Sequence, residues 1–325
     1  MSENMHESKK YYATALDPIH VGSGGSRLGR VDLPIIREPG TNLPKIPGTS
    51  LSGPARAYTA LRENRYLWKE NNQEYSCAGR GGEGGEKHCG KVEPACPVCI
   101  PYGFSKGTGY SMQGLAQFFD AHILFFPVGS MAGPIWVTSP MALEGLGLNQ
   151  KFEAPAEAFF PLGEQIQNKE KLNFGWLMLN KGNGQGNTSK LPDKIPDNKI
   201  PDNIKQRLVL VSDKLFSHIV NSNLEVRTSV SIDPQTGTAE EGALFTYEAI
   251  SRGTVLTFDI VYNSGKTFRI GGKELKTEEN GEVGISWVKA QVEKGLKLFE
   301  TLGIGGMGTR GMGRLKILNL EKEDC

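Results

Sequence analysis

The sequence predicts an α+β fold, because segments typical of strands alternate with segments typical of helices and long insertions separate them. The clearest strand is residues 115–126, LAQFFDAHILFF, which is strongly apolar and β-prone. The clearest helix is residues 286–302, where apolar side chains recur on one face. We therefore expect an antiparallel sheet with helices packed against it.

The length and composition limit the function. A chain of 325 residues can form one large domain or two with a substantial core. Its 37 Lys and Arg balance 36 Asp and Glu, so bulk positive charge cannot hold a nucleic acid. Any RNA contact must use local basic groups, helix ends and backbone amides. The polar N-terminus lacks a signal-peptide core, no apolar run could span a membrane, and the few clustered cysteines favour a reducing cytoplasm.

The N-terminal segment leads into the first strand. We expect residues 1–10 to be frayed and residues 11–16 to form a strand. His20 follows in the loop that leaves this strand. It could act as a general acid or base or contact RNA, but a loop histidine that hydrogen-bonds the backbone and holds the turn is the favoured interpretation.

The next loop is rich in glycine and carries one acid. Gly22, Gly24, Gly25 and Gly29 give it the freedom to close over a ligand. Asp32 stands at its far side, between two apolar residues. An isolated aspartate is usually a surface or turn residue, so its position alone assigns it no catalytic role.

Residues 50–65 are predicted to form a helix. Ser50 or Ser52 could be the N-cap, and Pro54 is tolerated in a first turn. The free N–H groups of the first turn could bind an anion. Arg56 would lie about one turn into the helix, where it could contact an RNA phosphate or belong to a solvated basic face.

Residues 66–110 resemble an insertion that holds a metal ion. Four cysteines follow the pattern C-x11-C-x6-C-x2-C, and four thiolates make a closed tetrahedral site for a structural Zn²⁺. Glycines around the second cysteine suit a loop wrapped round a metal, and His88 could replace Cys89 as a ligand. The alternatives are unconnected thiols or a redox CxxC pair. The predicted ligands are Cys77, Cys89, Cys96 and Cys99.

The middle of the chain continues the alternation, with a strand at 135–139 and a helix at 140–146. Asp120 and His122 interrupt the apolar strand two residues apart and therefore share one face. They could be a metal pair, but a satisfied polar edge is favoured. Residues 182–205, with the near-repeat KIPDNKIPDN, are predicted to form a low-complexity surface loop.

A hairpin is predicted in the C-terminal half. Residues 225–232 alternate apolar and polar side chains, DPQTG at 233–237 signals a turn, and residues 244–250 return. The other elements expected here are strands at 207–212, 255–262 and 314–320 and a helix at 213–221.

A glycine-rich loop precedes the last strand. Its backbone N–H groups could approach phosphates closely. Because it follows a helix and lacks the Lys-Ser/Thr ending of a P-loop, ATP binding is excluded, and a permissive helix-to-strand turn is the alternative. The candidate residues are Gly305, Gly306, Gly308, Thr309 and Arg310.

Six motifs, in order, resemble the RAMP superfamily of CRISPR effector proteins, and within it the repeated backbone subunit of the type III-B (Cmr) complex. They are HVGSG, VDLPIIRE, PKIPGTSLSGPAR, AHILFFPVGSMAGPIWVTSP, TGTAEEGALFTYEAI and LGIGGMGTRGMGRLKIL. Each is weak alone, but together they span most of the chain.

The resemblance implies a fold. We expect a single RAMP domain over residues 1–325, with a ferredoxin-like (RRM-like) core, a lid loop and the zinc-binding insertion. Residues 228–250 would be a protruding thumb that wedges into the guide–target duplex. The glycine-rich loop would lie against the guide-RNA backbone.

The resemblance also implies a site. The acid of the V-D-x-P-I motif is Asp32, which would cut target RNA with Mg²⁺ or Mn²⁺. Relatives often carry Lys at the position of Ser52, which puts one phosphate contact in doubt. The partners would be guide CRISPR RNA, target RNA, further copies in a filament and other effector subunits. The expected RNA-binding residues are His20, Ser50, Ser52, Arg56, Gly305, Gly306, Gly308, Thr309 and Arg310.

The chemistry would use the ribose 2′-OH as nucleophile and leave a 2′,3′-cyclic phosphate and a 5′-OH. Asp32 could be the base or hold a hydrated Mg²⁺. Two alternatives stay open: a non-catalytic RNA-binding scaffold, and a metal-independent ribonuclease that processes guide precursors with His20.

Overall fold

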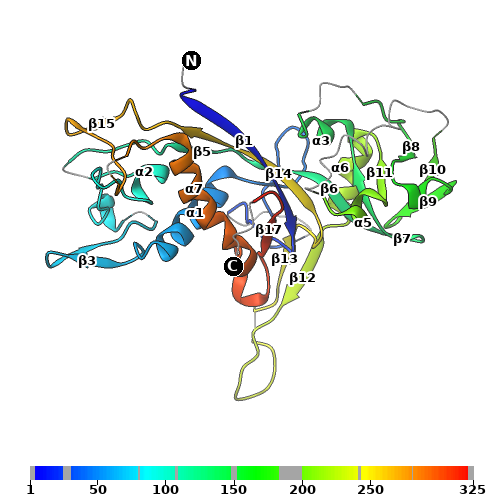
Figure 1. The fold of residues 1–325 in the computed structure, drawn as a ribbon. Coiled ribbons are helices and arrows are strands. Elements are labelled where there is room, and N and C mark those ends of the chain that lie inside the picture. Colours follow the sequence, from blue (N-terminus) through cyan, green and yellow to red (C-terminus); the bar gives the residue numbers. More distant parts are fainter. Residues whose placement is uncertain are drawn as a thin grey trace.

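The computed structural model describes residues 4–24, 31–79, 81–106, 109–147, 152–182, 200–240, 243–279 and 281–320. Its centre is an antiparallel four-stranded sheet with two helices (Figure 1). Helix α1 follows the first strand and α7 follows the third, which is the β-α-β-β-α-β order of the ferredoxin-like fold. In spatial order the strands are β17 (Leu315–Ile317), β1 (His6–Ala15), β14 (Val255–Asn263) and β6 (Ala121–Ser130), and the helices are α1 (Gly48–Arg62) and α7 (Ile285–Lys297).

The strand β1 begins earlier than the sequence indicates. The expectation that residues 1–10 are frayed is wrong from His6 onward, because residues 6–14 pair in register with β14. Two lysines of this segment also form ion pairs, Lys9 with Glu293 at 2.6 Å and Lys10 with Asp259 at 2.9 Å. Long-range pairing therefore orders a polar segment that shows no apolar pattern of its own.

The predicted strand at 115–126 is two strands. Strand β5 (Ala116–Phe118) and β6 both pair with β14, and the chain breaks between them at Asp120. The Asp120 carboxylate accepts from the Gly48 N–H at 2.8 Å and bonds the Lys45 ammonium at 2.8 Å. The prediction of a satisfied polar edge is confirmed for this acid.

The start of helix α1 corrects the predicted caps. The helix begins at Gly48, with Pro47 at the N-cap position and no capping side-chain hydrogen bond from that residue. The prediction of Ser50 or Ser52 as the N-cap is therefore wrong. Asp120, from the β5–β6 break, supplies the carboxylate instead. A Cβ on Gly48 would lie 2.3 Å from the Phe118 oxygen, so glycine is required where the helix meets the sheet.

The sheet extends beyond β6 and becomes mixed. Strands β11 and β7 pair in parallel, as do β10 and β8, so the prediction of an antiparallel sheet holds only for the centre. Strands β7 and β11 can pair in parallel because the long segment between them crosses over and brings β11 back beside β7. The extension consists of β7 (Gly133–Thr138), β11 (Leu208–Leu210), β8 (Ala158–Pro161), β10 (Leu177–Lys181) and β9 (Lys171–Phe174), with short β2 (Lys45–Ile46) beside β6.

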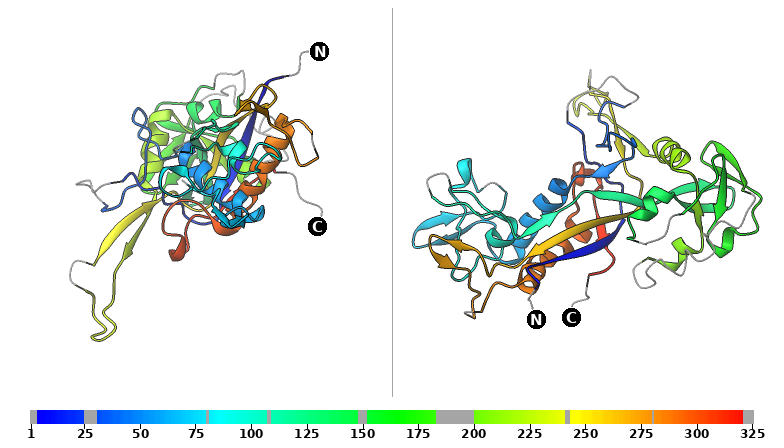
Figure 2. Two further views of the ribbon diagram at one scale, coloured as in Figure 1. Left: turned by 90° about the vertical axis from the view of Figure 1, so that its left-hand side faces the viewer. Right: turned by 90° about the horizontal axis from the view of Figure 1, so that it is seen from above.

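Short elements surround the sheet on two sides, as Figures 1 and 2 show. Beside the extension are α3 (Pro140–Glu144), η2 (Glu164–Ile166), α5 (Asp202–Lys205) and α6 (Asp213–Ser222). The insertion contains β3 (Trp68–Glu70), β4 (Gln73–Tyr75), η1 (Glu83–Gly85) and α2 (Cys99–Tyr102), and lies near β15 (Arg269–Ile270) and β16 (Lys273–Glu274). The last turns are α8 (Phe299–Leu302) and η3 (Gly308–Arg310). Most of the predicted 182–205 loop, at 183–199, lies outside the described residues.

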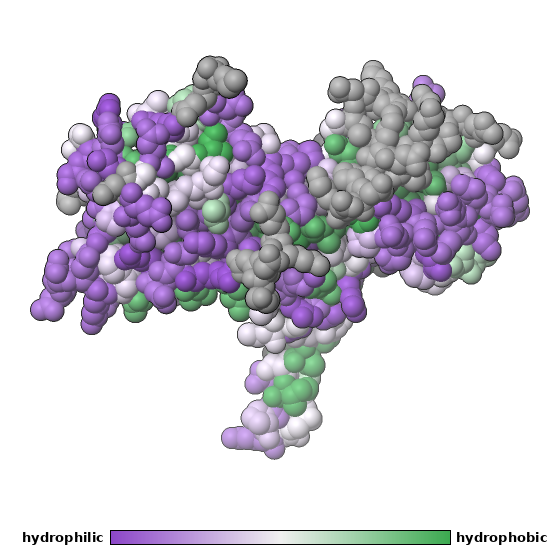
Figure 3. All heavy atoms as spheres, viewed as in Figure 1, coloured by the Kyte–Doolittle hydropathy of each residue, from purple (hydrophilic) through white to green (hydrophobic). Residues whose placement is uncertain are grey.

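The predicted hairpin is present and projects from the body (Figures 1 and 2). Its strands β12 (Glu225–Ser229) and β13 (Phe245–Ala249) form a separate two-stranded sheet. Val226 on β12, and Val230, Ile232 and Leu244 beyond the strands, have exposed apolar side chains, and Figure 3 shows hydrophobic surface along the projection. No helix among the described residues is long and apolar enough to cross a membrane.

The packing of α1 on α7 depends on a glycine. A Cβ on Gly295 would lie 2.3 Å from the Ala55 oxygen and 2.5 Å from the Thr59 Oγ1. We expect Gly295→Ala to lower the unfolding free energy by about 1–3 kcal/mol, because the helices must separate to admit the methyl group. Thermal and urea unfolding measure this.

The matched control is Gly53→Ala on α1. Nothing lies within 4 Å of a Cβ at Gly53, so alanine should leave stability unchanged or raise it by up to about 1 kcal/mol. Equal stabilities of the two variants would contradict the close approach of α1 and α7.

Candidate functional site

The VDLPI segment is held as an extra strand against the base of the hairpin. Leu33 forms a parallel bridge with Tyr247, with the Leu33 N–H donating to the Thr246 oxygen at 3.0 Å. On the other side, Ile35 bridges Gly22 in the loop that leaves β1. The segment is therefore fixed between two parts of the chain that are more than 200 residues apart.

Asp32 lies exposed at the edge of this segment. Its Oδ2 accepts from the Thr246 N–H at 2.7 Å and from the Thr246 hydroxyl at 2.9 Å. These hydrogen bonds, the backbone one first, hold the pKa of the Asp32 carboxyl below its usual value. The geometry thus presents an oriented, ionised carboxylate to solvent where the projection leaves the body.

Glu248 supports the segment from behind. Its side chain is 11% exposed, and its Oε2 accepts from the Ile35 N–H at 3.3 Å. Its Oε1 accepts from the Arg37 guanidinium at 2.8 Å, which also donates to the Ile35 oxygen and to Asn221. This nearly buried ion pair fixes the register of the segment that carries Asp32.

His20 is buried beneath the same surface. Its Nδ1 lies 2.6 Å from the Glu248 carbonyl oxygen, which can only accept, so Nδ1 carries the proton. Its own carbonyl accepts from the Gly306 N–H at 2.8 Å. The interpretation of His20 as a residue that bonds the backbone and holds the turn is confirmed.

The glycine-rich loop packs over His20. A Cβ on Gly305 would lie 2.5 Å from the His20 oxygen, and Gly305 has a φ of +76° that favours glycine. At the loop's exposed end, the Arg310 guanidinium lies 5.1 Å from the centre of the Phe245 ring on β13. Gly308 and Thr309 begin the same turn. The structure thus brings Asp32, His20 and the predicted glycine-loop residues to the base of the hairpin.

Ser50, Ser52 and Arg56 lie elsewhere, on α1. The Ser52 hydroxyl bonds the Thr49 oxygen within the first turn. The Arg56 guanidinium faces the insertion, where Nε donates to the Cys77 oxygen at 2.8 Å and Nη2 lies 3.1 Å from His88 Nε2. Helix α1 reaches the glycine loop through the Tyr58 hydroxyl, which donates to the Gly303 oxygen at 2.7 Å.

The four predicted cysteine ligands come together in the insertion. Their Sγ atoms all lie within 4.8 Å of one another, with separations of 3.5, 3.8 and 3.9 Å for three pairs. A tetrahedral ion with metal–sulfur bonds of about 2.3 Å needs sulfurs about 3.8 Å apart. All four are buried, so the cluster can hold a metal ion. The four are Cys77, Cys89, Cys96 and Cys99.

Within the cluster, the Cys77 thiol is the one whose pKa is lowered most strongly by its neighbours. Hydrogen bonds from the thiols of Cys89, Cys96 and Cys99 hold the pKa of the Cys77 thiol far below its usual value. His88 is outside the set of clustered ligands, because its Nε2 contacts the Arg56 guanidinium. The structure therefore favours Cys89 over His88 as the second ligand.

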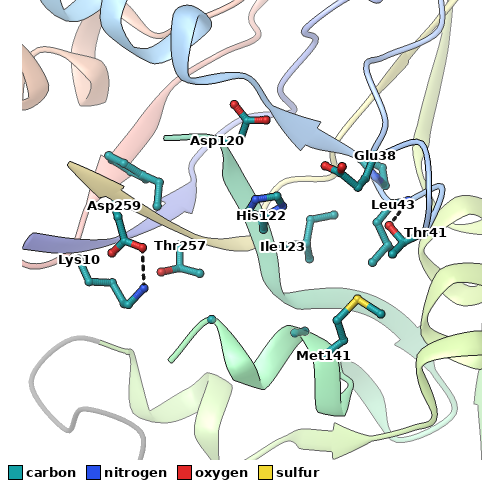
Figure 4. Close-up of a pocket in the computed structure, with 14 residues that line it drawn as sticks. Lys10, Glu38, Thr41, Leu43, Asp120, His122, Ile123, Met141, Thr257 and Asp259 are labelled. Atoms are coloured by element: carbon teal, nitrogen blue, oxygen red, sulfur yellow. Dashed lines mark hydrogen bonds and ion pairs between the residues drawn. The ribbon is translucent and has the colours of Figure 1, made fainter. Parts of the chain in front are cut away.

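A separate pocket lies between the sheet and α3 (Figure 4). It has a volume of about 280 Å³, and the Lys10–Asp259 ion pair, His122 and Met141 are among its lining residues. It contains neither Asp32 nor His20, so it is distinct from the surface at the base of the hairpin.

Three supporting residues were missed by sequence reasoning: Thr246, Glu248 and Arg37. The one signal that could have identified Glu248 is its position as an acid between apolar residues of a predicted strand, in the segment TYEAI. The sequence carries no signal that pairs these residues with the VDLPI segment, because 211 positions separate Arg37 from Glu248.

We expect Arg37→Ala to destabilise the protein by roughly 3 kcal/mol, because it leaves the Glu248 carboxylate nearly buried without its partner. Urea unfolding measures the loss, and faster amide hydrogen exchange at 31–36 should accompany it. The double variant Arg37→Ala, Glu248→Gln should regain part of the stability. A single variant as stable as the wild type would show that the pair does not hold the segment.

Comparison with known proteins agrees with this architecture. The family model of the RAMP superfamily matches residues 12–316. The chain is 28% identical over 306 residues to the CRISPR system Cmr endoribonuclease Cmr4 of Pyrococcus furiosus, covering 86% of this chain and 93% of that protein.

Solved structures share the fold over nearly the whole chain. The crystal structure of Cmr4 superposes with a TM-score of 0.57 at 20% identity, covering 96% of this chain and all of that one. A chain of the type III-B Cmr-beta in its apo state superposes with a TM-score of 0.62 at 16% identity, covering 96% of this chain and 97% of that one. An oligomeric Cmr4 from Pyrococcus furiosus superposes with a TM-score of 0.56 at 20% identity, covering 97% of this chain and all of that one. By the extent of the family match, the chain belongs to the RAMP superfamily.

Proposed function

We propose that this protein is a repeated, guide-RNA-binding backbone subunit of a type III-B CRISPR effector, and that it cleaves paired target RNA at Asp32. The observation that carries the proposal is the exposed, ionised Asp32 carboxylate, oriented by Thr246 at the base of the projecting hairpin. The similarity to an endoribonuclease over most of the chain supports cleavage, and the shared fold with a chain of the type III-B Cmr-beta and with an oligomeric Cmr4 supports the assembly.

The RNA-binding surface would be the glycine loop and the chain beside it. Gly305, Gly306, Gly308 and Thr309 let the backbone approach phosphates, and Arg310 adds a charge on the same turn. His20 would shape this loop from beneath. Because the net charge is only +1, we propose that the guide is read through backbone and shape, and that base pairing supplies the sequence specificity.

The first turn of α1 would play a smaller part. Ser50 and Ser52 stay candidates for phosphate contacts, but the Gly48 N–H at this helix end already donates to the Asp120 carboxylate. A carboxylate at this helix end disfavours a second anion.

Asp32 would act as an ionised oxygen ligand more than as a base. A carboxylate whose pKa is lowered by hydrogen bonds is a poor proton acceptor at neutral pH. An exposed carboxylate oxygen is a suitable ligand for Mg²⁺ or Mn²⁺, since such an ion usually keeps several bound waters. Such an ion, when bound, would stabilise charge on the scissile phosphate and favour loss of the proton from the attacking 2′-OH. Thr246 would orient the carboxylate, and the hairpin would fix the geometry of the RNA.

Two alternatives can be separated by the same residues. A pure scaffold would bind RNA without Asp32-dependent cleavage. A metal-independent ribonuclease would need His20 at the reacting atoms, but the side chain is 6% exposed and its Nδ1 proton is used by the Glu248 carbonyl. The geometry therefore favours the Asp32 proposal over the His20 alternative.

The cysteine cluster, we propose, holds a structural Zn²⁺. Four buried thiols at tetrahedral spacing are typical of closed zinc sites that order a segment without reacting. Cys77, Cys89, Cys96 and Cys99 would bind the ion.

The first test is cleavage of target RNA by the assembled, guide-loaded complex. We expect Asp32→Asn and Asp32→Ala to lower cleavage at least 100-fold in Mg²⁺ while target binding changes less than twofold, because both remove the negative charge and neither changes the glycine loop. Asn keeps the acceptor for Thr246, so it controls for lost structure.

The outcomes separate the three functions. Regularly spaced wild-type cuts that disappear in chelator and in both variants support the proposal. Wild-type complex that binds target but makes no cuts in any metal would leave a scaffold. Cuts that persist in chelator and in Asp32→Ala would place the active site elsewhere, with His20→Ala as the next variant.

A second prediction concerns pH. Because Thr246 lowers the pKa of Asp32, the carboxylate stays ionised, and cleavage should persist, at pH values where an ordinary aspartate begins to protonate. Thr246→Val removes the hydroxyl that donates to Asp32 and should move the acidic limb of the pH–rate profile to higher pH. Single-turnover rates at saturating Mg²⁺ measure this. Superimposable profiles would show that Asp32 ionisation does not limit the reaction.

A further inference from the structure

Arg56 is the one predicted RNA-binding residue whose side chain turns toward the insertion. It lies on α1 and is only partly exposed. Its Nε donates to the Cys77 backbone oxygen at 2.8 Å, and its Nη2 lies 3.1 Å from the His88 Nε2. Both partners belong to the segment that wraps the cysteine cluster.

These two contacts orient half of the cluster. The Cys77 N–H donates to the Arg65 oxygen at 3.0 Å and its oxygen accepts from Arg56, so α1 and the residues just after it hold Cys77 from both sides. His88 precedes Cys89 and is 4% exposed. The His88 Nε2 lies 3.1 Å from the Arg56 guanidinium and 3.3 Å from the Gly79 carbonyl oxygen, so the ring is held between helix α1 and the insertion.

A third contact ties the other half of the cluster to the same helix face. Thr59 lies three residues after Arg56, one turn along α1. Its Oγ1 is 3.0 Å from the hydroxyl of Tyr102, the last residue of the short helix that begins at Cys99. One face of α1 thus holds the insertion beside three of the four cysteines.

We propose that Arg56 positions the ligands of the metal centre through its contacts with Cys77 and His88, and that metal binding is thereby coupled to helix α1. The inference rests on the proposed Zn²⁺ site. Arg56 orients the Cys77 backbone and shields the His88 ring, so that Cys77 and Cys89 are preset for the ion. Such outer-shell hydrogen bonds position metal ligands, and their loss typically weakens metal binding about 10–100-fold. The side chain is therefore committed to the insertion instead of an RNA phosphate.

The experiment uses the full chain as wild type, Arg56→Met, Arg56→Lys and the control Lys69→Met. Lys69 is exposed on β3 of the same insertion, so its variant removes an equal charge. Zinc content is measured by elemental analysis, and release into an excess of colorimetric chelator is followed in time. Binding of a single-stranded RNA oligonucleotide is then measured at several salt concentrations.

We expect one zinc per wild-type chain and 10–100-fold faster release from Arg56→Met, with Lys69→Met like the wild type. Arg56→Lys keeps the charge but reaches only one acceptor, so its release should be intermediate; this variant decides the matter if the Met variant fails to fold. The slope of log affinity against log salt should stay unchanged, since no phosphate contact is lost.

Release from both Arg56 variants at the wild-type rate overturns the inference. If the salt slope also falls by about 0.7, Arg56 is a phosphate contact. Wild-type chain purified in zinc but without bound zinc overturns the metal site and the inference together. One zinc per chain with unchanged release rejects only the inference and leaves the metal site and the Asp32 proposal standing.

Discussion

Glu248 is the residue on which the surface at the base of the hairpin depends. Its N–H donates to the Leu33 oxygen and its carbonyl accepts from His20, while its carboxylate holds the Ile35 N–H and Arg37. A nearly buried carboxylate is costly without hydrogen-bond donors, and here each carboxylate oxygen has one. The loop after β1, the VDLPI segment and the hairpin base are thereby locked into one unit.

This unit explains how a protein of balanced charge can offer an RNA-binding and cleaving surface. A single carboxylate in a free loop would be poorly oriented, but pairing along β13 and the two bonds from Thr246 remove that freedom before any RNA binds. The same packing places the glycine loop and Arg310 nearby. Preorganisation of a few groups takes the place of a large basic patch.

The insertion follows a second physical logic. Its buried apolar residues, such as Val98, Ile100 and Phe104, join the main core, and four sulfurs at metal-binding spacing add a second constraint. Its contacts with one face of α1, through Arg56 and Thr59, connect it to the central sheet. Helix α1 also reaches the glycine loop through Tyr58, so the insertion and the hairpin surface share one rigid element.

The sequence by itself determined the features that depend on local pattern: the α+β class, the core strands, the helix with its apolar stripe, the hairpin with its turn and the cysteine spacing. Only the family resemblance points to Asp32, since a single aspartate forms no local pattern. Only the tertiary structure decided that Asp120 replaces the serines at the start of α1, that the sheet turns parallel after β7, and that Arg56 faces the cysteines. Each of these depends on groups brought together from distant positions, and the energy of such contacts leaves no local trace in the residues that make them.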